Sequence, residues 1–495
     1  MRAEAARNKP SKPMKNQSPS EDDALPAEDA LPSPGGMISE EGIAGLPPQS
    51  FVERAKTGAR LIAGSSFVRT SSVYLFGSIA NAILPLALLP ILTRYLTPQD
   101  YGLVATATVL IQVLIVFQGL NAYGLIARAH FDENKKSLSD LVSAAVAFAV
   151  SITLLLLCVI PIFGNYLGTW VKFPPAWLPL VLFMGLATII QNNYLALCQA
   201  RKEPCRFLMN QTIGSTLALG LSLLFVVTFG MDWRGRMWGN SISLAVVALI
   251  SIYGFIFRLG VLKFVFVRSA LRELLAFGVP LIPHVIGGWV MTMAARLYLN
   301  NMATVADTGL YSVAFNLTSP LAMLVGAANN AYMPTLFGKL SSKTDYNKIR
   351  LCQILLVAVF ILPLVALAGA FAARMILPFI VGQRFYGASD YIIWMALTYA
   401  IQGVYFIFGN FVVYAKRTTL LTWRADFVGG IVLTIFCPIL IRLNGPIGAA
   451  QATCLAFTAS TLGCISAARK AFPMPWWAAF NSLLRMGSSA KKRVR

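Results

Sequence analysis

The chain has 495 residues, of which 57% are hydrophobic and only 12% are charged, and its mean hydropathy is +0.67. Average globular chains are about 25% charged, so this composition excludes a soluble protein and predicts an all-α integral membrane protein with many spans. The net charge of +21 raises the question of a nucleic-acid partner, which the placement of the charges decides below. The seven cysteines form no C-x-x-C pair, so neither a metal site, a cofactor nor a redox motif is predicted.

The N-terminal segment differs from the rest of the chain. Residues 1–50 are polar, rich in Pro and Ser, and hold eight of the 20 acidic residues. Such a segment cannot bury enough apolar surface to fold, and it lacks the apolar region of a signal peptide. We therefore expect a disordered cytoplasmic tail, followed at 51–69 by an amphipathic helix on the membrane surface.

From about residue 70 the chain becomes a series of apolar stretches. A spanning helix needs roughly 20 such residues, and the sequence predicts twelve spans, with boundaries uncertain by several residues. The spans are expected at 70–93, 101–126, 138–163, 177–200, 206–230, 237–257, 273–298, 307–332, 351–372, 388–412, 418–441 and 446–468. Proline and glycine within several of them are tolerated when neighbouring helices satisfy the freed backbone groups.

The basic residues indicate how these spans are oriented. With the N-terminus in the cytoplasm, 27 Lys and Arg side chains flank the cytoplasmic ends of spans, and only six flank the opposite ends. Positive residues favour the cytoplasmic side, so both termini are expected there and the number of spans is expected to be even. The basic excess is thus a topology signal with anionic lipid as its counter-charge, and no nucleic-acid partner is predicted.

The two halves of the membrane region carry short matching segments. Asp100-Tyr101-Gly102-Leu103 opens the second span, and Asp307-Thr308-Gly309-Leu310 opens the eighth, 207 positions later. Gly239 and Gly448 open the sixth and twelfth spans at nearly the same offset. Six spans in each half give a parallel repeat about an axis along the membrane normal, and transporters commonly bind substrate between such halves.

Three segments resemble a known family. Residues 89–102 (LPILTRYLTPQDYG) resemble the first-loop signature of the Wzx-type polysaccharide or O-antigen flippases. Residues 306–315 (ADTGLYSVAF) are similar to the family's segment that opens the second lobe, and 446–450 (PIGAA) resembles its twelfth-helix opening. These flippases belong to the multidrug/oligosaccharidyl-lipid/polysaccharide exporter superfamily. The resemblance extends over roughly 65–470.

The resemblance implies a fold and a function. The fold is a V-shaped bundle like that of the multidrug and toxic compound extrusion (MATE) transporters, with two six-helix lobes at 70–260 and 261–472. An interfacial helix and a basic cytoplasmic tail follow at 473–495. The implied function is translocation of polyprenyl-diphosphate-linked oligosaccharides across the bacterial inner membrane for surface polysaccharide synthesis. The implied partners are the lipid-linked oligosaccharide, membrane lipids and, as candidates, a polysaccharide polymerase and a chain-length regulator.

Arginines within or beside the spans are the first candidates for contact with a diphosphate, because ionisable groups in the bilayer are costly to bury. Arg296 lies near the outer end of the seventh span, and Arg94 is its repeat mate. Many relatives carry Asp directly before this arginine, where this chain has Ala295. Arg424 lies in the eleventh span and Arg128 ends the second. The alternative for all four is an anchor at the membrane interface.

Two further groups of residues suit coupling and sugar binding. Asp426 in the eleventh span and His284 in the seventh are candidates for ion coupling, since histidine titrates near neutral pH. The alternative for Asp426 is a structural ion pair, and the alternative for His284 is a structural role in which it bonds to freed backbone carbonyls. Asn192 and Asn193 form a polar notch in the fourth span, and their amides suit sugar hydroxyls. Gln191, Asn210, Gln211, Asn329 and Asn330 are read in the same way. Hydrogen bonds between helices are the alternative.

Three functions remain in competition. No nucleotide-binding loop, metalloprotease motif or nucleophile elbow occurs, so the chain is not expected to be an enzyme. The flippase leads. A cation-coupled drug or metabolite antiporter of the same superfamily would need buried carboxylates, and outside the N-terminal tail and the helix ends the chain offers only Asp426. A membrane polysaccharide polymerase usually carries a long catalytic loop outside the membrane, which this chain lacks.

Overall fold

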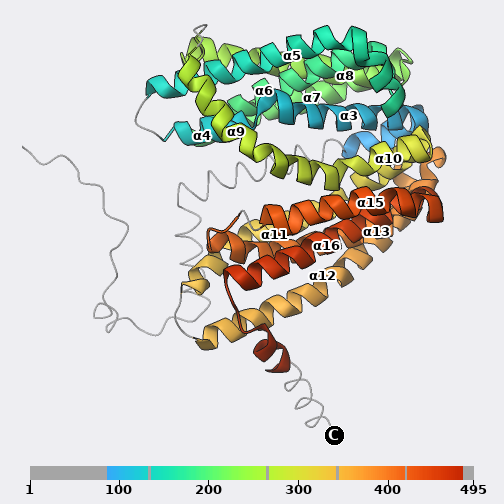
Figure 1. The fold of residues 1–495 in the computed structure, drawn as a ribbon. Helices are drawn as coiled ribbons and strands as arrows, with labels where there is room; N and C mark the ends of the chain where they lie inside the picture. The colour runs from blue at the N-terminus through green and yellow to red at the C-terminus, as the bar shows by residue number, and fades with distance from the viewer. Residues whose placement is uncertain (1–85, 132–134, 264–266, 342–344, 419–420, 483–495) are drawn as a thin grey trace, which may run out of the picture. The chain divides into compact units, whose positions relative to one another are not determined.

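The computed structural model describes residues 86–131, 135–263, 267–341, 345–418 and 421–482, and all regular structure in these ranges is helical (Figure 1). The predicted tail at 1–50 and the amphipathic helix at 51–69 lie outside the described residues. Of the predicted first span at 70–93, only the helix Leu86–Tyr95 is described. Of the predicted C-terminal segment, a short helix at 476–482 is described, with Trp476 packed on Phe408 and Phe411.

The remaining helices follow the predicted spans in order. The first half contains α3 (Pro98–Gly119), α4 (Ala122–Ala129), α5 (Lys135–Val171), α6 (Leu178–Ala200), α7 (Pro204–Leu223) and α8 (Asp232–Tyr253). The second half contains α9 (Arg268–Trp289), α10 (Ala295–Met302), α11 (Val305–Leu340), α12 (Asp345–Ile380), α13 (Ser389–Tyr414), α15 (Phe427–Asn444) and α16 (Gly448–Ala471).

Ten helical runs in the described part of the chain are long and apolar enough to cross a membrane. The last run, Trp423–Ala471, joins α15 and α16 through the short turn Gly445–Ile447, so it contains two predicted spans. The predicted all-α class is confirmed, and each of the second to twelfth predicted spans overlaps a helix.

The core is divided between the two halves. Leu141, Leu197 and Phe255 belong to a buried cluster of the first half, and Tyr311, Phe385 and Leu433 belong to one of the second. We call α3–α8 the first lobe and α9–α16 the second lobe. In Figure 1, α9 runs between the two groups of helices. Its first turns, with Ala270 and Leu274, pack into the first-lobe cluster.

The internal repeat has a direct structural counterpart. Thr97 caps α3 by accepting from the Asp100 backbone N–H (3.2 Å), and the Asp100 carboxylate accepts from the Thr97 N–H (3.0 Å). Thr304 and Asp307 make the same capping box at the start of α11, 207 positions later. Both helices therefore begin with the same geometry, and they cross at these ends.

This crossing depends on two repeat-related glycines. A Cβ atom on Gly102 would lie 1.9 Å from the carbonyl oxygen of Val305, and one on Gly309 would lie 1.9 Å from that of Pro98. Small residues permit such close backbone approach between membrane helices. We call this contact the glycine crossing; it joins the first lobe to the second.

Several helices depart from the regular spans that hydropathy predicts. The second predicted span is broken, because Leu120 and Asn121 adopt left-handed backbone conformations (φ 44° and 56°) between α3 and α4. Helix α9 lies close to this break, where a Cβ on Gly278 would be 2.4 Å from the Leu120 oxygen. π-helical turns at Val290–Ala294 and Thr422–Asp426 interrupt the seventh and eleventh spans. Such turns are frequent at functional sites.

Candidate functional site

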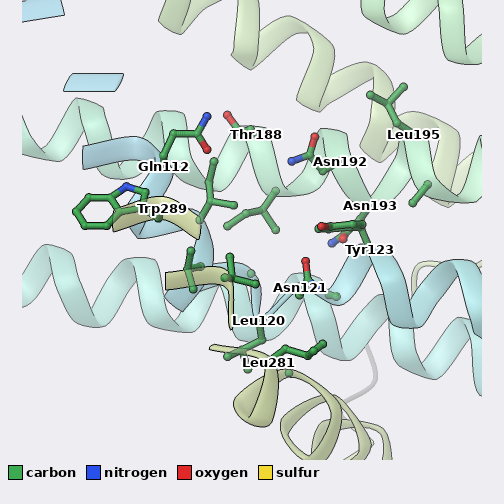
Figure 2. Close-up of a pocket in the computed structure, with 18 of the residues that line it drawn as sticks. Gln112, Leu120, Asn121, Tyr123, Thr188, Asn192, Asn193, Leu195, Leu281 and Trp289 are labelled. Carbon is green, nitrogen blue, oxygen red and sulfur yellow. The ribbon is translucent and has the colours of Figure 1, made fainter. Parts of the chain in front are cut away.

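A large cavity lies between helices of the first lobe and α9. Its volume is about 710 Å³, and Figure 2 shows its labelled residues. Six amide side chains line it, together with the aromatic rings of Tyr123, Phe207 and Trp289. The amides are Gln112, Asn121, Asn192, Asn193, Gln199 and Gln211. We call this space the amide cavity.

Two smaller cavities continue from the amide cavity toward the glycine crossing. The first, of about 320 Å³, shares Asn192, Leu195 and Gln211 with the amide cavity and adds Arg236. The second, of about 180 Å³, shares Arg236 with the first and adds Arg296. We call this last space the arginine cavity. The three cavities therefore adjoin, and their character changes from neutral amides at one end to two cations at the other.

Arg296 is held rigidly at the wall of the arginine cavity. The residue is 5% exposed, its Nε donates to the Ser312 hydroxyl (3.2 Å), and one terminal nitrogen donates to the Thr292 carbonyl (3.2 Å). The guanidinium carbon lies 4.5 Å from the centre of the Phe315 ring, a cation–π arrangement. Among the described residues Arg296 has no acidic partner. Burying an unpaired cation is costly, so the site is suited to an anion.

Arg236 is the second cation of this cavity. One of its terminal nitrogens donates to the Ser222 hydroxyl (2.7 Å) and to the Ala218 carbonyl (3.3 Å), and no carboxylate among the described residues pairs with it. On the same wall, Asn316 donates to the Tyr101 hydroxyl across the lobes (2.7 Å). The arginine cavity thus combines two guanidinium groups with neutral hydrogen-bonding groups.

A buried polar network closes the structure next to the glycine crossing. Asn300 donates to the Thr106 hydroxyl (2.8 Å) and to the Val171 carbonyl (3.0 Å), both in the first lobe. Its amide oxygen accepts from the Thr308 hydroxyl (2.6 Å) in α11. Buried networks of this kind fix one arrangement of helices. The lobes are therefore joined at the end where α3 and α11 begin.

Asp426 and His284 come together although 142 positions separate them. His284 Nδ1 lies 3.0 Å from an oxygen of Asp426, and the Tyr405 hydroxyl donates to the other oxygen (3.1 Å). The Asp426 side chain is 13% exposed and the His284 side chain 50% exposed. Asp426 also lines a separate apolar groove between α9 and α15. The pair therefore connects α9, α13 and the π-helical turn before α15.

The other predicted residues occupy different positions. Asn192 and Asn193 line the amide cavity. Arg94 and Arg128 are exposed at the ends of their helices and do not line the cavities described above. Arg424 donates to the Ser466 hydroxyl of α16 (3.0 Å).

Several of the predicted amides bond between helices. Gln191 donates to Asn210 (3.1 Å), and Asn410 donates to Asn329 (2.8 Å). These contacts match the helix-packing interpretation of the polar notches.

Sequence reasoning missed Arg236, which it counted among residues flanking the outer ends of the spans. The sixth span was expected to start at 237, but α8 begins at Asp232, so Arg236 lies one turn inside the helix. The sequence did offer one signal: Arg236 lies three residues before Gly239, the glycine of the internal repeat. In the structure this glycine packs directly on Ser222, the residue that Arg236 contacts.

The amino-acid sequence matches a known family and two proteins of one bacterial species. Residues 67–339, more than half of the chain, match the model of the family described as "Polysaccharide biosynthesis protein". An "Uncharacterized membrane protein" of Haemophilus influenzae is 26% identical over 356 residues, which cover 71% of this chain and 85% of that protein. "Lsg locus putative protein 1" of the same species is 23% identical and covers 72% of this chain and 86% of that protein.

Solved structures share the fold. The lipid II flippase MurJ in an inward closed conformation matches with a TM-score of 0.66 and 12% identity, covering 84% of this chain and 92% of that one. An inward-facing MATE family transporter of the MOP superfamily matches with a TM-score of 0.56 and 15% identity, covering 83% and 96%. The predicted MATE-like fold is therefore confirmed.

Proposed function

This chain belongs to the polysaccharide biosynthesis protein family, and on that premise we propose that it is a flippase for polyprenyl-diphosphate-linked oligosaccharides. It is a multi-pass membrane protein. We place it in the bacterial inner membrane with both termini in the cytoplasm, following the distribution of its basic residues. In that orientation α3 and α11 begin on the outer side, so the glycine crossing closes the outer end.

The arginine cavity carries the proposal. A lipid-linked sugar brings a diphosphate through the bilayer, and this group needs fixed cations and hydrogen-bond donors in place of water. Arg296 and Arg236 supply two guanidinium groups, and no carboxylate among the described residues neutralises either of them. The lipid tail stays in the bilayer while the headgroup occupies the cavities. Release on the outer side then requires that the glycine crossing and the Asn300 network separate.

We assign coupling to the His284–Asp426 pair. Protonation of either partner changes the charge between α9 and the π-helical turn before α15. Since α9 also packs against the first lobe, a change at this pair can bias how the lobes meet. Proton exchange at this pair would then drive the alternation of the two lobes.

The antiporter is the weaker alternative for this structure. A cationic drug requires carboxylates in its binding site, whereas the described residues that line the three adjoining cavities include two arginines and no acid. A polymerase and a chain-length regulator remain proposed partners that would use the product on the outer side.

The test is genetic and biochemical. Deletion of the gene is expected to stop surface polysaccharide and to leave the lipid-linked intermediate facing the cytoplasm. Complementation with Arg296→Ala is expected to fail at normal membrane protein level, while the exposed Arg94→Ala serves as the control. Normal surface glycan in the deletion strain, with altered drug tolerance instead, would refute the flippase.

A further inference from the structure

The amide cavity is a preformed site that the proposed diphosphate contacts do not use. Among the described residues that line it, none carries a charge, although six carry amides. Its volume of about 710 Å³ lies within the range of small-molecule sites. A cavity of this size, with many hydrogen-bonding groups and no charged side chain among its described lining, is suited to a ligand that is polar and neutral.

Asn193 gives the second observation. The residue is only 1% exposed, and its Nδ2 group has no hydrogen-bond partner in the described part of the chain. Buried polar groups are nearly always paired, so an unpaired donor at a cavity wall indicates a missing acceptor. Its neighbour Asn192 also lines this cavity, and both residues are labelled in Figure 2.

The aromatic wall narrows the class of ligand. The Trp289 indole nitrogen donates to the Val109 carbonyl (3.3 Å), which fixes the ring beside the cavity. This ring gives the cavity apolar aromatic surface, while the amides offer donors and acceptors. Pyranose sugars combine an apolar face with a rim of hydroxyls, and they match both surfaces.

The uncharged lining of the amide cavity favours neutral sugars over acidic ones. A carboxylate in the amide cavity would lose its water without gaining a cation, which is strongly unfavourable. The two cations line the adjoining cavities and not the amide cavity: Arg236 lines both of them, and Arg296 lines the arginine cavity, where the diphosphate is proposed to bind. The cavity is therefore built against sugars that carry acidic groups.

We infer that the amide cavity binds the uncharged sugars of the headgroup, with Asn193 as a specificity-determining residue. This inference rests on the proposed function, because the diphosphate in the arginine cavity is what brings the sugars to the amides. The arginine cavity and the amide cavity follow one another as the diphosphate and the sugars do in the ligand.

The experiment measures binding of three synthetic probes to the full chain in lipid nanodiscs. The probes are a polyprenyl diphosphate, the same lipid with a neutral N-acetylhexosamine disaccharide, and that lipid with the terminal sugar oxidised to a uronate. The neutral glycolipid is expected to bind about tenfold more tightly than the bare diphosphate lipid, and the uronate is expected to lose that gain.

Variants then locate the effect. Asn193→Leu, which keeps the branched shape of the side chain but removes its polar atoms, and Asn192→Ala, in the same helix, are each expected to reduce the gain from the disaccharide at least threefold without changing the affinity for the bare lipid. Asn301→Ala is the matched control, because the Asn301 amide donates to the Leu297 carbonyl of its own helix and is not among the described residues that line the cavity. Thermal unfolding of each purified variant checks that it is folded.

The outcomes separate the two proposals. Equal affinity for all three probes, or an unchanged disaccharide gain in both cavity variants, would refute the sugar site while leaving the diphosphate site intact. Failure of every probe to bind the wild-type chain would instead refute the proposed function.

Discussion

The glycine crossing leads to the most direct prediction. In Gly102→Ala the new methyl group would lie 1.9 Å from the Val305 oxygen, whereas real Cβ contacts stay above 3.0 Å. The backbones of α3 and α11 must therefore separate by about 1 Å at this point. Overpacking of this kind costs about 1–3 kcal/mol. Because the cost falls only on the state in which the crossing is closed, the substitution shifts the equilibrium between states by about 5–150-fold.

The assay reports access from the outer side. Thr108 lines the arginine cavity just beyond the crossing, and Thr108→Cys provides a labelling site. The exposed native Cys158 and Cys205 are first replaced by alanine. In intact cells, a membrane-impermeant maleimide is expected to label this cysteine much faster when Gly102 is changed to alanine. Gly326→Ala is the matched control, since a Cβ there meets nothing within 4 Å.

The repeat mate tests the reasoning further. Gly309→Ala is expected to have the same effect as Gly102→Ala, because its Cβ would lie equally close to the Pro98 oxygen. The double substitution is expected to add little, since one separation of the helices accommodates both methyl groups. Labelling at the wild-type rate in both single variants would refute the crossing as the outer closure, and full additivity would refute a shared contact.

Three further predictions concern other parts of the molecule. Asp426→Asn and His284→Asn are each expected to remove the pH dependence of flipping in proteoliposomes with an imposed proton gradient; wild-type dependence in both would exclude the pair from coupling. Arg424→Ala, which loses a hydrogen bond to Ser466, is expected to lower transport less than Arg296→Ala in a reconstituted assay at matched protein level; the reverse order would contradict the cavity assignment. Thr304→Ala removes the cap of α11 and is expected to destabilise the protein by about 1 kcal/mol, seen as an earlier thermal transition, with an unchanged transition as the contrary result.

Hydropathy predicted the helical spans well because each buries its backbone hydrogen bonds within itself, independently of its neighbours. The repeat was also visible, since Asp100 and Asp307 act in capping boxes that depend on a few adjacent residues. The break at Leu120 was not predictable. It is held by the approach of Gly278 from another helix, which leaves no trace in local periodicity.

The candidate site was predicted only in part for a similar reason. Single costly residues such as Arg296 and Asp426 stand out in an apolar span. Their contacts do not: Asp426 and His284 were each singled out, but their contact joins distant parts of the chain and leaves no local pattern. Arg236 was missed because a shift of five residues in the start of α8 changes it from a flanking residue into one that lines two cavities.

The π-helical turn at Val290–Ala294 sets the direction in which Arg296 points. Such a turn holds one residue more than an α-helical turn, and each residue of an α-helix adds about 100° of rotation. If the same residues formed a regular α-helix, Arg296 and Asn300 would instead face about 100° away from their present partners. The register of this span, as much as the identity of its arginine, therefore determines whether the cation faces the cavity.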